Sequence, residues 1–292
     1  AAFCNWLLFI FRFNTFYASM ALLTLTSDIG EQDYLAGAVK AVLLNQDPSF
    51  QLVDITHQLS PFNDPQAAYI IRNATRQFPH NTFHIVLVNL FQYVPDHLLL
   101  AKHGHQYYCL ADNGLITMIL EEPPEQVVAL PLDKAKARNT LACAEVFGKA
   151  ITQLAAGKAL AEIGDASVSI QVRNPLRPIT NSQYIEGQII SIDHFENVIV
   201  NITQEEFEAQ RKGRRFKIVF KRDEVFDRIS ETYADVAERE KLALFNEAGY
   251  LEVSINKGYD AGLFGLQDFS EKSTSQYTQS RLFYQTVRVY FE

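Results

Sequence analysis

The sequence predicts an α/β fold in which an N-terminal α/β domain precedes a small, mainly antiparallel β domain. Through the first half, apolar strand-like segments alternate with segments whose apolar residues recur at helical spacing. After about Asp165 the apolar segments become short and are separated by turns, which is typical of a small barrel or sandwich. A chain of 292 residues with 48% hydrophobic and 21% charged residues is long enough to bury a sizeable core.

The first half contains strand-like and helix-like segments in alternating order. Strands are predicted over residues 21–26, 50–55 and 82–88, and helices over residues 34–45, 65–78 and 139–160. We expect Asp47 and Pro48 to end the first helix, and Asp64 to cap the second, with Pro65 at its first position. Two further apolar segments, residues 107–111 and 116–120, flank the turn signal Asp112-Asn113-Gly114. This order predicts a parallel or mixed sheet with covered faces.

The second half contains short strand-like segments only. They cover residues 168–172, 184–192, 197–202, 216–220, 242–246, 251–255 and 285–291. Residues 173–181 contain Pro175 and Pro178 and mark the domain boundary. We therefore predict a Rossmann-like α/β domain over residues 20–175 and a small antiparallel β-barrel domain over residues 182–292.

Residues 1–19 differ in character from the rest of the chain. They are aromatic and apolar, with Arg12 as their one charge, and they lack the basic start of a signal peptide. Met20 directly precedes the first strand. We expect the natural chain to begin at Met20, with residues 1–19 a leader or non-native extension; a secretory or anchor segment is the alternative.

Charge and cysteine content limit the class of protein. The net charge is −8, and an acidic surface disfavours nucleic-acid partners, which require clustered basic residues. The basic run at residues 211–215 is interpreted as a solvated turn. Cys4, Cys109 and Cys143 are too few and too scattered for a disulfide framework, which indicates a reducing cytoplasm. Beyond residue 20 no stretch is long and apolar enough to span a membrane.

Several polar residues lie where ligands are commonly bound. Asp28 ends the first strand, at the edge where α/β sheets bind ligands, and its carboxylate could accept both hydroxyls of a ribose. Spacing alone favours a turn or helix-cap role for this aspartate. His57 is interpreted as a structural histidine near a strand end. His103 and His105 lack a nearby carboxylate cluster, so we expect them in a loop rather than at a metal.

Residues 193–197 lie between two predicted strands of the second half. Asp193, Phe195 and Asn197 combine an anion, a flat apolar ring and an amide. These groups suit an amino group, an aromatic base and its ring nitrogens. A hairpin turn that uses Asp and Asn for turn chemistry explains the same residues equally well.

Short motifs occur along the chain in a defined order. They are Thr26-Ser27-Asp28-Ile29-Gly30, Asp33, Val53-Asp54-Ile55-Thr56-His57, Phe78-Pro79, Asp112-Asn113-Gly114, Asp193 with Phe195, Asn197 and Asn201, and Tyr250-Leu251-Glu252-Val253 with Asn256, Gly258 and Ala261. In this order they resemble the S-adenosylmethionine (SAM) cleaving family that includes the SAM hydroxide adenosyltransferases, fluorinases and chlorinases. The resemblance covers residues 20–266, with Glu196 in place of the family's Gly.

The resemblance implies a homotrimer in which SAM lies between the N-terminal domain of one subunit and the C-terminal domain of its neighbour. Asp28 would hold the ribose hydroxyls, and Asp33 and Asp193 would lie near the methionine ammonium. Phe195 and Asn197 would contact adenine. The implied reaction is attack on the ribose C5′ with methionine leaving from the sulfonium. SAM is the substrate, and neither a metal nor a separate cofactor is implied.

The chain departs from the family at the residues that handle water in its hydrolytic branch, which are an Asp, an Arg and a His. Asn89 stands at the Asp position, residues 94–97 contain no Arg, and Ala142 stands at the His position. An amide cannot accept a proton as a carboxylate can. The pair Glu247-Ala248 replaces a polar pair at the methionine end, where a Glu would repel the methionine carboxylate.

Three functions are consistent with these departures. The first is a SAM hydrolase that forms adenosine and methionine with other groups, with His97, Tyr93 and Glu145 as candidates. The second is a transferase that uses a different nucleophile. The third is a SAM- or adenosine-binding protein without catalysis. We favour SAM cleavage, because the ligand-binding motifs are largely present.

Overall fold

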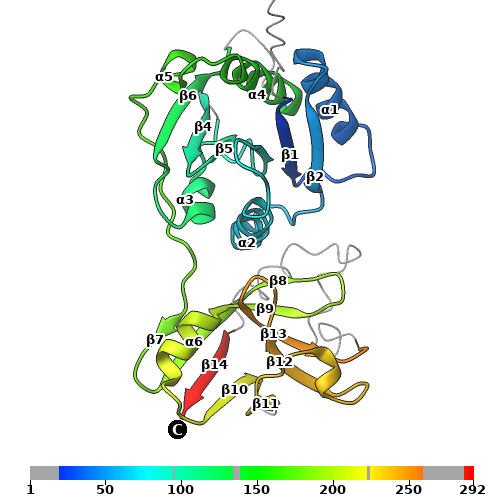
Figure 1. Cartoon of the computed structure of the whole chain (residues 1–292), viewed down its shortest axis with the longest axis vertical. Helices are drawn as coiled ribbons and strands as arrows, with labels where there is room; N and C mark the ends of the chain where they lie inside the picture. Colours follow the sequence, from blue (N-terminus) through cyan, green and yellow to red (C-terminus); the bar gives the residue numbers. More distant parts are fainter. Residues whose placement is uncertain (1–19, 95, 134–138, 222–223, 259–285) are drawn as a thin grey trace, which may run out of the picture.

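The computed structural model describes residues 20–94, 96–133, 139–221, 224–258 and 286–292 (Figure 1). The predicted leader over residues 1–19, including Cys4, lies outside the described residues, as do Ala261 of the last motif and Gln285 at the start of the last predicted strand. Within the described part of the chain, no helix is long and apolar enough to cross a membrane.

The first sheet has six strands among the described residues, in the order β2-β1-β3-β5-β4-β6. Their bounds are β1 (Leu22–Ser27), β2 (Gln51–Thr56), β3 (Phe83–Leu87), β4 (His97–His103), β5 (Gln106–Ala111) and β6 (Gln126–Pro131). Strands β2, β1, β3 and β5 are parallel, whereas β4 runs antiparallel to β5 and β6. The sheet is therefore mixed, and the carboxyl ends of its parallel strands lie at one edge.

Helices cover both faces of this sheet, as Figure 1 shows. The helices are α1 (Leu35–Gln46), α2 (Asp64–Thr75), α3 (Leu115–Leu120), α4 (Thr140–Ala155) and the short α5 (Leu160–Ile163). Alternate residues of β3 point to opposite faces: Ile85 packs in the core under α1 and α4, and Val86 packs in the core under α2 and α3. Strands buried on both faces explain the near-continuous apolar run in this part of the sequence.

The second sheet is antiparallel and forms a nearly closed barrel. Its strands are β7 (Ile179–Thr180), β8 (Tyr184–Ile192), β9 (Val198–Thr203), β10 (Phe216–Lys221), β11 (Glu224–Phe226), β12 (Lys241–Phe245), β13 (Tyr250–Ile255) and β14 (Thr286–Phe291). Helix α6 (Gln204–Arg211) follows β9 and places the fully buried Phe207 into the barrel core, and a 3-10 turn covers Tyr233–Asp235. The predicted α/β fold with an antiparallel barrel is confirmed.

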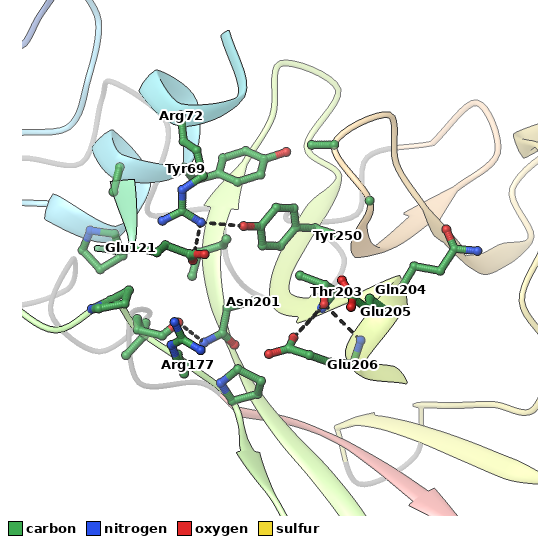
Figure 2. A pocket seen from close by; sticks show the side chains of 18 of the residues that line it. Tyr69, Arg72, Glu121, Arg177, Asn201, Thr203, Gln204, Glu205, Glu206 and Tyr250 are labelled. Atoms are coloured by element: carbon green, nitrogen blue, oxygen red, sulfur yellow. Dashed lines mark hydrogen bonds and ion pairs between the residues drawn. The ribbon is translucent and has the colours of Figure 1, made fainter. Parts of the chain in front are cut away.

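Helix α2 contacts the barrel through Arg72 and Tyr69 (Figure 2). Arg72 Nη1 donates hydrogen bonds to the Tyr250 hydroxyl at 2.9 Å and to Glu121 Oε1 at 2.6 Å, and Nε donates to the Ile119 carbonyl at 2.8 Å. The rings of Tyr69 and Tyr250 meet edge to face, with centroids 5.1 Å apart. A buried guanidinium thus connects α2, the end of α3 and strand β13.

Most predicted elements lie within a few residues of the observed ones, but the start of α2 differs. Asn63, not Asp64, is the cap, because its side-chain oxygen accepts the Gln66 N–H at 3.2 Å. Asp64 is therefore the first helical residue, and Pro65 is the second. This change frees the Asp64 side chain for contacts outside the helix.

The prediction of a strand over residues 168–172 is wrong. This segment has no regular secondary structure, and Val168 and Ile170 pack against the core beneath α2 and α3. Its backbone is held by side chains: the Gln171 N–H donates to Asp112 Oδ1 at 2.8 Å, and the Arg173 N–H donates to Thr117 Oγ1 at 2.9 Å. Apolar alternation alone does not distinguish this arrangement from a strand.

Other differences are shorter. The apolar segment after Asp112-Asn113-Gly114 forms helix α3, and the helix predicted over residues 139–160 ends at Ala155, with α5 following separately. Strands β4, β6, β7 and β11 and helix α6 were not predicted from the sequence. His103 is the last residue of β4, so a loop position is wrong for it, whereas His105 lies in the turn before β5.

Candidate functional site

Asp28 lies immediately after β1, at the carboxyl edge of the parallel strands. The backbone N–H of Asn89, after β3, donates to Asp28 Oδ2 at 3.0 Å. Burial raises the pKa of the Asp28 carboxyl, and the nearby charge of Asp64 adds to this effect while the Asn89 N–H opposes it. Asp28 does not cap α1, which begins at Leu35, and the Asn89 N–H holds its carboxylate at the sheet edge.

Asn89 is buried, and both the oxygen and the nitrogen of its side-chain amide form hydrogen bonds. Its Oδ1 accepts the Phe62 N–H at 3.1 Å, and its Nδ2 donates to Asp64 Oδ1 at 2.8 Å. Asn113 holds the backbone at this position, because Asn113 Nδ2 donates to the carbonyls of Val88 at 3.2 Å and of Asn89 at 3.4 Å. Arg173 Nη1 is ion-paired with Asp64 Oδ2. We call Asp28, Asn89, Asp64 and Arg173 the sheet-edge group.

Asp33 and His57 have local contacts near this edge. Asp33 is exposed, and its Oδ1 accepts the Leu35 N–H at 2.8 Å in the first turn of α1. His57 is buried, with hydrogen bonds joining Nδ1 to Ser27 Oγ at 2.7 Å and Nε2 to Asp54 Oδ1 at 3.1 Å. The interpretation of His57 as a structural histidine is confirmed.

Asp193, Phe195 and Asn197 lie in the turn between β8 and β9, and we call them the turn group. Asp193 Oδ1 accepts the backbone N–H groups of Phe195 and Asn197, both at 2.8 Å, and Asn197 Nδ2 donates to Asp193 Oδ2 at 2.9 Å. The Phe195 ring is 68% exposed, whereas Asn197 is buried. Glu196 has a φ of 65°, in the left-handed region that a glycine would occupy without strain.

The turn group borders a cavity of about 1250 Å³ between the barrel and the segment from β2 to α2. Glu252 lines the same cavity and accepts hydrogen bonds from the Tyr233 hydroxyl and from Ser254 Oγ, both at 2.7 Å. Burial raises the pKa of Glu252, and the charge of Asp193 adds to this effect. Glu252 and Tyr233 were not predicted as site residues, although a carboxylate within the apolar strand β13 is a signal for Glu252.

The predicted site residues thus lie in two separate places, the cavity beside the turn group and the carboxyl edge of the first sheet. Asp193, Phe195 and Asn197 share the cavity, whereas Asp28, Asp33 and Asn89 are not among its lining residues. A second cavity of about 810 Å³, shown in Figure 2, lies beside Arg72 and Tyr250 and contains none of these six residues.

Ala142 lies in the first turn of α4, where its backbone N–H donates to Asn139 Oδ1 at 2.9 Å. Among the other candidates, His97 Nε2 lies 3.2 Å from Asp112 Oδ2, and Glu145 forms an ion pair with Lys149 on the same helix. Tyr93 is 52% exposed. No group of three or more metal-ligating side chains occurs within the described ranges.

The fold is that of two crystal structures described as conserved proteins. One is from Thermotoga maritima, with a TM-score of 0.73, 23% identity and coverage of 92% of this chain and 99% of that one. The other is from Thermus thermophilus, with a TM-score of 0.66, 22% identity and coverage of 93% and 99%. These likenesses define the class: an α/β domain joined to an antiparallel barrel.

The chain belongs to the SAM hydroxide adenosyltransferase family, whose N-terminal domain model matches residues 23–164 and whose C-terminal domain model matches residues 187–271. A relative named (R)-S-adenosyl-L-methionine hydrolase, also from Thermus thermophilus, is 27% identical over 83% of this chain and 94% of its own length. A fluorinase from Actinopolyspora mzabensis is 21% identical over 86% and 95%.

Proposed function

We propose that this protein binds SAM and cleaves it at the ribose C5′ with water, which yields adenosine and methionine. The observation that carries the proposal is Asp28, a carboxylate fixed by the Asn89 N–H at the carboxyl edge of the parallel strands. Family membership supports SAM as the ligand, because relatives named SAM hydrolase and fluorinase match most of the chain. SAM is the substrate, and the proposal requires no metal or additional cofactor.

The proposed ligand contacts follow the chemistry of each side chain. Asp28 accepts the ribose hydroxyls, and the exposed Phe195 ring and the Asn197 amide bind adenine. Asp33 and Asp193 attract the methionine ammonium. Since the reaction is a displacement, orienting the nucleophile in line with the C5′–S bond and excluding bulk water are the main tasks of the protein.

We further propose that the working unit is a homotrimer, with each site formed by the N-terminal domain (residues 20–175) of one subunit and the C-terminal domain (residues 182–292) of the next. In support of this, the turn group and the sheet-edge group occupy different places within one chain. A ligand that contacts both groups is accommodated if they come from neighbouring subunits. A cytoplasmic location remains a prediction from the sparse cysteines.

A second candidate function is SAM or adenosine binding without turnover. Two observations favour it: the amide of Asn89 is engaged on both sides, and Ala142 supplies only a backbone N–H at the start of α4. Neither position provides a proton acceptor. A transferase that uses another nucleophile would show the same lack of hydrolysis.

Incubation of the protein with SAM, with adenosine and methionine separated by chromatography, tests these functions. We expect the unmodified chain to release adenosine and the Asp28→Ala variant to release none. Asp47→Ala is the matched control, because Asp47 is a turn aspartate bonded to Ser49 at the opposite edge of the sheet. Calorimetric SAM binding that depends on Asp28, without product, would support binding alone; absence of binding would refute both functions.

A further inference from the structure

Asp64 is a second carboxylate beside Asp28. It lies in the first turn of α2, and its side chain is 14% exposed. Asp64 Oδ1 accepts from Asn89 Nδ2 at 2.8 Å, while the Asn89 backbone N–H holds Asp28 at 3.0 Å. One residue therefore holds both carboxylates, and the charge of Asp64 acts on Asp28 directly.

Arg173 completes the arrangement from the segment that leads to the barrel. Its Nη1 is ion-paired with Asp64 Oδ2, and its Nη2 donates to Gln92 Oε1 at 3.2 Å. Thr117 fixes its backbone in both directions: the Arg173 N–H donates to Thr117 Oγ1 at 2.9 Å, and Thr117 Oγ1 lies 2.8 Å from the Arg173 carbonyl.

Gly114 makes room for the Arg173 side chain. A Cβ at position 114 would lie 2.5 Å from Arg173 Cγ, and the φ of 85° also favours glycine there. The turn Asp112-Asn113-Gly114 therefore has two roles, because Asn113 also supports Asn89. The sequence thus places a carboxylate and a guanidinium together from positions 109 residues apart.

The amide at position 89 fits this pair. An aspartate there would place a second carboxylate about where the amide now contacts Asp64 at 2.8 Å, and the two anions would repel each other. Asn89 instead donates a hydrogen bond to Asp64, so that Asp64 is the one carboxylate of this pair of positions, 64 and 89.

On the basis of the function proposed above, we propose that Asp64, held by Asn89 and Arg173, is the carboxylate that binds the attacking water. A carboxylate has about four acceptor positions, and the two contacts shown here leave acceptor capacity on both oxygens. With the ribose hydroxyls on Asp28, the proposal places C5′ of the same sugar beside Asp64, because Asn89 joins the two carboxylates.

The bond changes are those of a displacement. The water oxygen forms a bond to C5′, the C5′–S bond breaks, and its electron pair remains on the sulfur of methionine. The proton that water loses passes to the Asp64 carboxylate and then to solvent. Arg173 holds the Asp64 carboxylate in position before the attack and after the proton transfer.

The test measures kcat for adenosine release and the Kd for SAM in the full chain and its variants. We expect Asp64→Asn to lower kcat on the order of 100-fold with Kd changed less than about threefold. The exchange Asn89→Asp with Asp64→Asn restores one carboxylate and one amide and should recover part of kcat.

Glu186→Gln is the matched control, because Glu186 is ion-paired with Arg288 in the barrel and its side chain is 16% exposed, close to the value for Asp64. Its kcat should equal that of the unmodified chain. The proposal is overturned if Asp64→Asn retains kcat, or if kcat, SAM binding and thermal stability are all lost together. If the unmodified chain binds SAM through Asp28 but releases no adenosine, the role proposed for Asp64 is refuted and SAM binding is retained. If the unmodified chain does not bind SAM, the proposed function itself is refuted.

Discussion

The sheet-edge group and the turn group are held by different kinds of contact. Asn89 contacts Asp28 across 61 residues of sequence, and Arg173 contacts Asp64 across 109. In the turn group, Asp193 contacts residues no more than four positions away. The first group therefore depends on the packing of the whole α/β domain, whereas the second depends on one turn. Substitutions that remove packing or hydrogen bonds beneath the first group should lower both stability and ligand affinity, whereas the isosteric Asp64→Asn exchange should leave both nearly unchanged. Substitutions in the second group should change ligand affinity alone.

The largest effect is expected where the two domains meet. Arg72→Met removes hydrogen bonds to Tyr250, Glu121 and the carbonyl of Ile119 and leaves buried acceptors without a donor. We expect a loss of about 3 kcal/mol in the free energy of unfolding, measured by urea denaturation. Arg76→Met, at an exposed position of the same helix end, should change it by less than about 0.5 kcal/mol. Equal effects would show that Arg72 contributes no specific connection.

A smaller loss is expected from Asn113→Ala, which acts on the sheet-edge group. Buried Asn113 donates to the carbonyls of Val88 and Asn89, and its Oδ1 accepts the Leu115 N–H at 3.1 Å. Its removal should cost about 2 kcal/mol of stability. Because Asn89 then loses its support, adenosine affinity measured by calorimetry should fall as well. Unchanged affinity in a destabilised variant would contradict the link between this turn and Asp28.

The same division explains what could be predicted from the sequence. Strands β1, β2 and β3, the first two helices and the turn at residues 193–197 follow from local patterns, and they were predicted within a few residues. The role of Asp64 could not be predicted, because a helix-start aspartate was expected to cap α2 and Asn63 does so instead. Arg173 lies in a segment stabilised by side chains of Asp112 and Thr117, and periodicity carries no signal for such contacts.

Substitution in the turn group should affect binding alone. The Phe195 ring is 68% exposed, so Phe195→Ala removes little packing within the chain. We expect the Kd for adenosine to rise about fivefold, equivalent to about 1 kcal/mol, because a stacking surface for the base is lost. The melting temperature should stay the same. A loss of stability without a change in adenosine affinity would place Phe195 outside the ligand site.

The smallest effect near neutral pH concerns the ionisation of Asp28. Since burial raises the pKa of this carboxyl, it takes up a proton at a higher pH than an ordinary aspartate does. Ribose hydroxyls donate to the charged form, so adenosine affinity is complete above this pKa and is lost as the pH falls through it, by up to about tenfold per pH unit. Calorimetry from about pH 7.5 down to about pH 4.5 should show the decline starting above the ordinary aspartate range. Asp28→Asn should bind weakly at every pH without this decline. A decline that persists in Asp28→Asn would assign the titration to another group. Glu252 in the turn-group cavity also has a raised pKa. The variant Glu252→Gln would then show whether the titrating group lies in the turn-group cavity.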